Sequence, residues 1–286
     1  MKFSRYEPAE LKFLAESCLR RGDYENAARF FRYLMVHFRM AKDESNYKKF
    51  AIKAGECYLR AAEKLRGSIK AIMLYLRAAK AFQEGGRIMM INLCSSRIWE
   101  YYTMLREGKF EENSENLHVF KVAGDYFMDN DDFRKATIIY HDIAEKALDS
   151  GRLLLAGEFY RNAGVCCQKM NNLDEAVSFY IKASDLYFSC QRYFEAAWNY
   201  CKAGFLLIHL YRFREASAVA EKAKLACREG QVEIFLRDLI RICKSLSRGR
   251  IYEATEDWQR IKWKLSREHI QLVENSFRIA RIKWGN

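Results

Sequence analysis

The sequence has very little of what enforces turns or carries out catalysis. Its 286 residues include one proline, 14 glycines and five histidines. The histidines are far apart, at His37, His118, His141, His209 and His269. Phosphate-binding glycine loops and the HExxH and GxSxG motifs are missing as well. These absences argue against an enzyme, and we expect neither a cofactor nor a metal.

The cysteines and the apolar runs exclude two further classes of protein. Nine cysteines are scattered at helical intervals among small apolar residues, without a CxxC pair. Such a pattern is typical of reduced core thiols in a cytosolic protein and not of a disulfide framework. The N-terminus, MKFSRYEPAE, is too polar for a signal peptide, and no apolar run is long enough for a membrane span. We therefore expect a cytoplasmic protein, with any membrane contact peripheral.

What the sequence does contain is an internal repeat with a period of about 20 residues, or about 40 for a full unit. Alanine recurs at the shorter interval, at Ala136, Ala156, Ala176, Ala196 and Ala216. Glycine recurs at twice that interval, at Gly124, Gly164 and Gly204, and each glycine precedes one of these alanines by the same distance. Such repetition indicates stacked helical hairpins, with the small residues where two helices cross closely.

The spacing within one repeat specifies the type of hairpin. Gly164, Ala176, Tyr180 and Ala183 match the small, Ala, aromatic, Ala pattern of tetratricopeptide repeats, although the period is longer than the usual one of about 34 residues. Each helix should then hold about 16 residues and be roughly 24 Å long. The predicted fold class is all-α: a right-handed solenoid of tetratricopeptide-like helical hairpins with a compact C-terminal helical bundle.

The regularity of the repeat varies along the chain. The single proline, Pro8, precedes a helical pattern, which suits the first position of a helix. Polar residues 107–116 break the phase and are predicted to form a loop between two sub-arrays. The spacing changes again from about residue 232. We therefore predict a helical-hairpin solenoid over residues 1–230 and a C-terminal helical cap over residues 231–286.

Positive charge is concentrated at the two ends. The chain holds 49 Lys and Arg against 37 Asp and Glu, a net charge of +12. Residues 1–50 account for +4 and residues 241–286 for +6, which leaves +2 for the repeats between them. This distribution favours acidic partners at particular places: an acidic protein surface, anionic lipid or nucleic acid.

Four of the predicted first helices carry a basic residue just before their small residue: Lys53, Lys121, Arg161 and Lys202. In stacked hairpins, equivalent positions form a row along one face. We predict that these cations line a concave wall and bind an acidic, rod-like partner. The alternative is four solvated charges.

Residues 30–40 (FFRYLMVHFRM) combine aromatic and apolar side chains with arginines. A basic amphipathic segment can bind a membrane surface, here through Phe30, Phe31, Leu34, Met35 and Phe38. The alternative, which we favour, is the second helix of the first hairpin, packed on the second hairpin.

The tail interleaves Trp258, Trp263 and Trp284 with lysines and arginines. This mixture occurs at nucleic-acid surfaces, and also wherever lysine stems cover a half-buried tryptophan. Nucleic acid is the weaker interpretation, because it requires the rings and the cations to share one exposed face.

Several segments resemble a known family. KVAGDYFMDNDDFRKATIIYHDIAEKA, RNAGVCCQKMNNLDEAVSFYIKASDLY and KAGFLLIHLYRFREASAVAEKA are similar to the hairpins of soluble NSF attachment proteins (SNAPs), and the tail EIFLRDLIRICKSLSRGRIYEATEDWQRI is similar to their C-terminal bundle. The resemblance covers residues from about 10 to 284. It implies a non-enzymatic adaptor that binds an acidic four-helix SNARE bundle and recruits an AAA+ ATPase to pull it apart, in membrane fusion and vesicle trafficking. Lys202 and Arg161 align best with the family's basic concave positions, and Lys121 also fits.

The chain departs from that family at two places. Its last residues are basic, where the family's C-terminus is acidic and carries a leucine that engages the ATPase. No separate apolar loop is visible between the first two helices, where the family has one that contacts membrane. Three functions therefore remain open: a SNAP-like adaptor, a generic tetratricopeptide-type scaffold for a peptide or regulatory partner, and a nucleic-acid-binding repeat protein.

Overall fold

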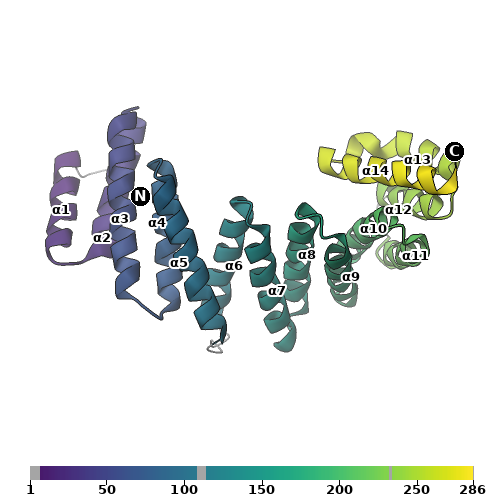
Figure 1. The fold of residues 1–286 in the computed structure, drawn as a ribbon, viewed down its shortest axis with the longest axis horizontal. Coiled ribbons are helices and arrows are strands. Elements are labelled where there is room, and N and C mark those ends of the chain that lie inside the picture. Colours follow the sequence, from purple (N-terminus) through teal and green to yellow (C-terminus); the bar gives the residue numbers. More distant parts are fainter. Residues whose placement is uncertain (1–6, 108–113, 232–233, 286) are drawn as a thin grey trace. The chain divides into compact units, whose positions relative to one another are not determined.

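The computed structural model describes residues 7–107, 114–231 and 234–285, and these residues form fourteen α-helices and one short 3-10 helix without any strand (Figure 1). The contacts divide the chain into two compact units, Met1–Phe127 and Met128–Asn286. None of the described helices combines the length and the hydropathy needed to cross a lipid bilayer. The predicted all-α fold of consecutive hairpins is confirmed.

The first unit contains five helices and most of a sixth: α1 (Pro8–Arg20), α2 (Tyr24–Met40), α3 (Glu44–Lys64), α4 (Ile69–Glu84), α5 (Ile88–Glu107) and α6 (Ser114–Asp129). From α1 to α5, each helix packs against the next. Pro8 is the first residue of α1, as predicted, and the Glu7 N–H donates to the Glu10 carboxylate at 3.1 Å in a capping box. Within the predicted loop 107–116, residues 108–113 lie outside the described residues.

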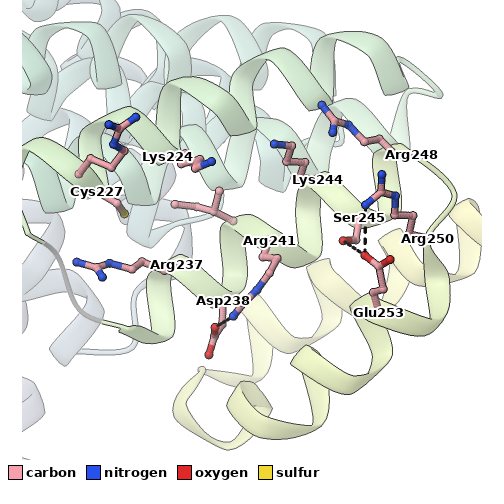
Figure 2. Close-up of a pocket in the computed structure, with 12 residues that line it drawn as sticks. Lys224, Cys227, Arg237, Asp238, Arg241, Lys244, Ser245, Arg248, Arg250 and Glu253 are labelled. Atoms are coloured by element: carbon pink, nitrogen blue, oxygen red, sulfur yellow. Dashed lines mark hydrogen bonds and ion pairs between the residues drawn. The ribbon is translucent and has the colours of Figure 1, made fainter.

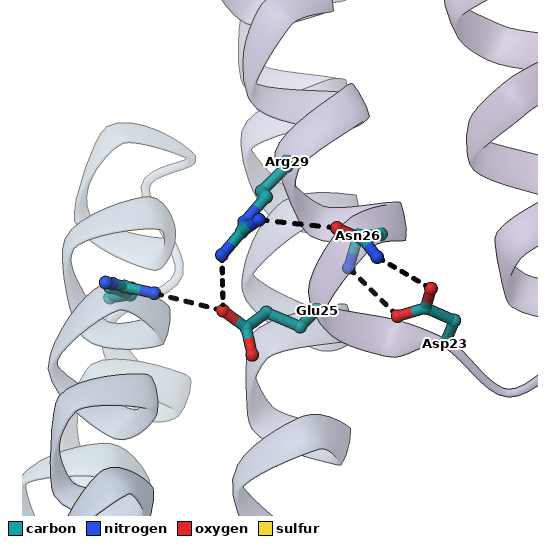
Figure 3. Close-up of polar contacts among 5 residues, drawn as sticks. Asp23, Glu25, Asn26 and Arg29 are labelled. Atoms are coloured by element: carbon teal, nitrogen blue, oxygen red, sulfur yellow. Dashed lines mark hydrogen bonds and ion pairs between the residues drawn. The ribbon is translucent and has the colours of Figure 1, made fainter.

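A polar network begins α2 and joins it to α4 (Figure 3). The Asp23 carboxylate accepts a hydrogen bond from the Asn26 backbone N–H at 3.3 Å and another from the Asn26 side chain at 2.7 Å. Glu25 lies 2.8 Å from Arg29 of its own helix and 3.5 Å from Arg77 of α4. The capping carboxylate therefore satisfies the first turn of α2, while the neighbouring acid connects two hairpins.

The second unit begins with the most regular part of the chain: α7 (Phe133–Asp149), α8 (Leu153–Lys169), α9 (Leu173–Ser189), α10 (Tyr193–His209) and α11 (Phe213–Glu229). Each of these five helices has 17 residues, one more than the length predicted from the period. Three turn residues separate consecutive helices. The 20-residue repeat is therefore one helix plus one turn, and two of them make a hairpin.

The turns share one backbone geometry. Their middle residue is left-handed, with φ of 72° at Gly151, 58° at Asn171, 59° at Gln191 and 59° at Tyr211. At the end of α8, the Asn171 N–H donates to the Gln168 carbonyl at 3.0 Å, and the next N–H donates to the Cys167 carbonyl at 2.9 Å. This pair of backbone hydrogen bonds is the Schellman motif, which satisfies two carbonyls at the end of the helix. Only one of these four left-handed positions holds glycine, so glycine alone does not mark the turns in the sequence, whereas the 20-residue period does.

The small residues lie where helices approach most closely, as predicted. All five alanines of the 20-residue series are completely buried. A Cβ added at Gly164 would lie 3.2 Å from the Tyr180 ring, and one added at Gly204 would lie 2.7 Å from Cys243 Sγ. A larger side chain at either glycine would therefore push its helix away from the neighbour.

An acid, a tyrosine and a lysine join three consecutive helices, and we call this arrangement a clip. In the first clip, the Tyr160 hydroxyl of α8 donates to Glu145 of α7. Lys182 of α9 lies 3.6 Å from the same carboxylate and 4.9 Å from the centre of the Tyr160 ring. The hydrogen bond from Tyr160, together with the charge of Lys182, holds the pKa of Glu145 below its usual value.

The second clip lies one hairpin further along the chain. The Tyr200 hydroxyl of α10 donates to Asp185 of α9, and Lys222 of α11 lies 3.1 Å from that carboxylate and 5.5 Å from the ring centre. The first clip therefore joins α7 to α9, and the second joins α9 to α11, in each case through a tyrosine on the helix between them.

The chain ends in α12 (Ile234–Ser247), α13 (Ile251–Ile261), a 3-10 turn (Lys262–Lys264) and α14 (Arg267–Trp284). Helix α12 packs against α10, α11 and α13, and α14 lies against α10. These helices leave the 20-residue period, as predicted. They belong to the second compact unit, together with α7–α11.

The close contact at Gly204 generates a stability prediction. Gly204→Ala should lower the free energy of unfolding by about 1–3 kcal/mol, because the new methyl group overlaps Cys243 Sγ. In a Cys243→Ala background the overlap is gone, and the same change should become neutral or stabilise by roughly 0.5–1 kcal/mol through helix propensity. Urea unfolding of the four proteins in a double-mutant cycle measures the difference. An equal cost of Gly204→Ala in both backgrounds would contradict the crossing geometry.

Candidate partner-binding site

Lys53 projects from α3 in the first unit. Its ammonium lies 5.5 Å from the centre of the Phe31 ring and 5.9 Å from that of Phe50. Contacts of this kind hold a cation in place while leaving it hydrated. Together with Lys49 and Arg87, Lys53 also lines an open groove of about 600 Å³. Lys53 thus belongs to a locally basic surface.

Lys121 projects from α6 and is paired within its own helix. Its Nζ lies 2.7 Å from Asp125 Oδ2, one turn further on. Exposed pairs of this kind contribute less than about 1 kcal/mol, so a carboxylate from a partner could replace Asp125. The structure places Lys121 beside an acid of its own helix.

In the second unit, two predicted cations lie around one buried ring. Lys202 Nζ of α10 is 5.1 Å from the centre of the Tyr180 ring of α9. Burial, and to a lesser degree the nearby charge of Arg161 on α8, lowers the pKa of Lys202 from 10.5 to about 8. The charge of Arg161 also acts on Tyr180. The charge of Arg161 therefore acts on both Lys202 and Tyr180, while Glu268 of α14 opposes its effect on Lys202.

Helix α14 is the reason for the burial of Lys202. The lysine lines a small, mostly apolar recess with Trp198, His269 and Leu272. The ring centres of Trp198 and His269 are 4.8 Å apart. Burial, and secondarily the charge of Lys202, holds the pKa of His269 below its usual value. Lys202 is thus half covered, and its charge is more available to a partner at neutral pH than at alkaline pH.

Two polar contacts fasten α14 over α10 and α8. The His209 Nε2–H donates to the Leu272 carbonyl at 3.1 Å, and Glu268 lies 3.3 Å from Lys169 Nζ. The sequence analysis assigned no role to Glu268 or His269. The sequence predicted a helical C-terminal cap, but nothing in it identified α10 as the surface on which α14 packs.

The segment predicted to contact membrane is mostly core. Phe31, Leu34 and Met35 are buried, because α2 packs against α3. The Phe31 and Phe38 rings both stack on Phe50, with centres 6.0 and 5.4 Å away. The prediction of membrane contact is therefore wrong for the three buried residues, and the preferred alternative, a second helix of the first hairpin, is correct. Membrane contact through the half-buried Phe30 and Phe38 stays a prediction.

The tail tryptophans do not share one exposed face. Trp258 is buried and packs on Phe277, with ring centres 6.3 Å apart. Trp284 packs on Phe213 at 5.6 Å, whereas Trp263 is 74% exposed. The arrangement that nucleic-acid binding by the tail would require is therefore not formed. Among the described residues, no three His, Cys, Asp or Glu side chains are grouped so that they could hold a metal ion.

The family model for soluble NSF attachment proteins (SNAPs) matches residues 37–208, which is more than half of the chain. The chain belongs to the SNAP family. The matched range contains all four predicted cations, in both units. No curated protein sequence matches significantly.

Solved structures similar to this SNAP-family chain have low sequence identity. Aspartyl phosphate phosphatase F from Bacillus subtilis is 11% identical with a TM-score of 0.41, covering 99% of this chain and 95% of its own. A Rap protein complexed with competence and sporulation factor is 12% identical with a TM-score of 0.39, covering 96% and 97%. The TPR2AB-domain:pHSP90 complex of yeast Sti1 is 13% identical with a TM-score of 0.37, covering 87% and 98%. Scores this low carry no argument about this chain.

The depressed pKa of Lys202 predicts how stability depends on pH. The unfolded chain keeps Lys202 protonated up to about pH 10.5, whereas the folded protein releases that proton near pH 8, so the contribution of Lys202 to the free energy of unfolding should rise between these values. Lys202→Met keeps the apolar stem and removes the charge. It should abolish this part of the rise and stabilise the protein at pH 7 by about 1–2 kcal/mol.

Guanidinium unfolding at pH 7 and pH 10 measures the effect as a difference between the wild type and the variant. Lys262→Met, which removes an exposed lysine of the 3-10 turn, is the control for a general loss of positive charge. If the wild type and Lys202→Met gain the same stability between the two pH values, the desolvation of Lys202 is refuted.

Proposed function

We propose that this protein is a non-enzymatic adaptor that binds an acidic, SNARE-like helical bundle and recruits an AAA+ ATPase that disassembles it. The observation that carries the proposal is membership of the SNAP family, in a matched range that contains Lys53, Lys121, Arg161 and Lys202. The protein would act in the cytoplasm and at the membrane periphery, during membrane fusion and vesicle trafficking. It would perform no chemistry of its own.

The pair formed by Arg161 and Lys202 is the best-defined contact for such a bundle. Lys202 of α10 lies over the Tyr180 ring, and Arg161 of α8 is near enough for its charge to act on Lys202, so the two cations could meet carboxylates spaced along an acidic rod. Charge complementarity of this kind accelerates encounter and sets the register of the complex. Part of the desolvation cost at Lys202 is already met in the free protein, because α14 covers it before any partner arrives.

An acidic partner would also change the protonation of Lys202. A carboxylate next to the ammonium favours its charged form and raises its pKa again. Above about pH 8 the complex must take up a proton that the free protein has lost, so binding should weaken there. The same reasoning gives binding that falls with increasing salt.

Recruitment of the ATPase is a separate property of the proposal. Residues 209–286 lie outside the matched range, and the chain ends in basic and aromatic residues instead of acidic ones. Among these, Trp284 is packed on Phe213. Bundle binding and ATPase recruitment therefore need independent tests.

Neutralising the cation pair should weaken bundle binding. Arg161→Gln with Lys202→Gln should lower the affinity for a purified acidic SNARE bundle by about tenfold or more at pH 7, because two charge-assisted contacts are lost. Fluorescence anisotropy with a labelled bundle measures the affinity, and circular dichroism confirms that the variant stays helical.

The matched control removes two other cations of the second unit. Arg134→Gln with Arg214→Gln neutralises exposed residues of α7 and α11, with the same change in net charge. It should change the affinity by less than about twofold, since long-range steering alone is weakly affected. Equal losses in the two double variants would refute a local site.

A pull-down from native cytosol and membranes, followed by mass spectrometry, tests the partners. Recovery of a coiled-coil membrane protein and an AAA+ ATPase, both reduced with the Arg161→Gln/Lys202→Gln variant, supports the adaptor. Recovery of only soluble proteins with an extended peptide motif would favour the alternative, a generic tetratricopeptide-type scaffold.

A further inference from the structure

Helices α11, α12 and α13 enclose a basic groove of about 900 Å³ (Figure 2). Its lining comprises Lys224, Cys227 and Arg228 of α11, Arg237, Asp238, Ile240, Arg241, Lys244 and Ser245 of α12, Arg248 and Arg250 of the following turn, and Glu253 of α13. Seven of these side chains are cationic and two are acidic. We call this site the basic groove. It is separate from the site around Tyr180.

The cations are placed by helical spacing. Arg237, Arg241 and Lys244 follow one another at intervals of four and three residues, which puts them on one face of α12, and Arg248 continues the line just beyond it. This row is about 16 Å long. In Figure 2, Arg237 lies at one end of the groove, and Arg248 and Arg250 lie at the other.

Part of this charge is neutralised within the protein. Arg241 pairs with Asp238 and lies 2.9 Å from Asp257, while Lys244 pairs with Glu221 of α11. Arg248 lies 3.6 Å from the same Glu221, and Arg250 lies 3.7 Å from Glu253, so a phosphate at that end would compete with these two carboxylates. The three remaining cations, two on α11 and one on α12, are not in ion pairs within the described part of the chain.

Three cations form no ion pair with a carboxylate of the described residues: Lys224, Arg228 and Arg237. They line the groove around Cys227, whose thiol is buried. The charge of Lys224 helps to lower the pKa of Glu221, whereas Arg228 and Arg237 lack such a partner among the described carboxylates, and a bound anion would reduce the repulsion among the three cations. This end of the basic groove is therefore a preformed site for negative charge.

The lining also restricts the kind of anion. Among the described residues that line it, Cys227 and Ile240 are the only apolar ones. A protein partner would need an apolar centre at its interface, which the basic groove does not offer. A volume of about 900 Å³ lies within the range of small-molecule sites. Arginine is the best side chain for bidentate contact with phosphate.

We propose that the basic groove binds a compact ligand with several phosphate groups, of the inositol phosphate class, either free or as the head group of a lipid. One phosphate would sit among Lys224, Arg228 and Arg237, and another near Arg248 and Arg250. Leu225 and Tyr252 flank the lining residues in the sequence and are 46% and 78% exposed, so they could contact the acyl region of a lipid.

Isothermal titration calorimetry with inositol hexakisphosphate at physiological salt tests the proposal. The wild type should bind one molecule. Lys224→Glu with Arg237→Glu should reduce the affinity by about tenfold or more, because two contacts to phosphate are lost and replaced by repulsion. Both residues are exposed, so the fold should persist, which thermal unfolding checks.

The matched control is Arg134→Glu with Arg214→Glu, which has the same change in net charge at exposed positions outside the basic groove. Vesicles containing phosphatidylinositol bisphosphate, compared with phosphatidylserine vesicles of equal surface charge, distinguish the two sources of phosphate. Binding to the soluble ligand alone, or also to the phosphoinositide vesicles, supports the proposal when it depends on Lys224 and Arg237. The proposal is overturned if neither probe binds, if both double variants lose affinity equally, or if an acidic peptide or RNA binds more tightly in the basic groove.

Discussion

The close approach of neighbouring helices is the constraint on which the rest of this structure depends. The buried alanines of the 20-residue series, and glycines such as Gly164 and Gly204, leave room for side chains of neighbouring helices to pack directly against the helix backbone. At that separation, a tyrosine reaches past its own hairpin, and its hydroxyl meets a carboxylate on the preceding helix. Lysines of the following helix then lie over the rings. The positions of the cations therefore follow from the packing of the smallest side chains.

Most of the fold could be predicted because its causes are local and periodic. One helix and one three-residue turn make each 20-residue unit, and small residues mark the crossings. The turn residues themselves gave no such signal. Gln191 and Tyr211 occupy left-handed positions that glycine would normally fill, because the Schellman bonds and the packed helices on either side impose the conformation. The end of the repeat near residue 232 was also visible, but the helix on which α14 packs was not.

The candidate sites were less predictable, because their environment comes from residues far away in the sequence. Arg161 and Lys202 were identified from their place in the repeat. The burial that lowers the pKa of Lys202 comes from α14, which follows α10 only after α11, α12 and α13. The basic groove was missed for a similar reason. The cationic stripes of α11 and α12 each resemble the solvated face of an ordinary helix. They line a common groove only because the two helices lie side by side. Residues 30–40 do form an amphipathic helix, but its apolar face packs against α3 and is not available to a membrane.

The two clips have a mechanical consequence. Helix α9 provides the lysine of the first clip and the acid of the second, Lys182 and Asp185, so both clips share one rigid rod. A force applied along this part of the protein would act on the first clip and the second clip in series, because both are attached to α9. Exposed ion pairs yield under small forces, whereas buried tyrosines anchored between helices resist. The ion pairs at the surface of the array should therefore break under load before the tyrosine contacts between the helices do.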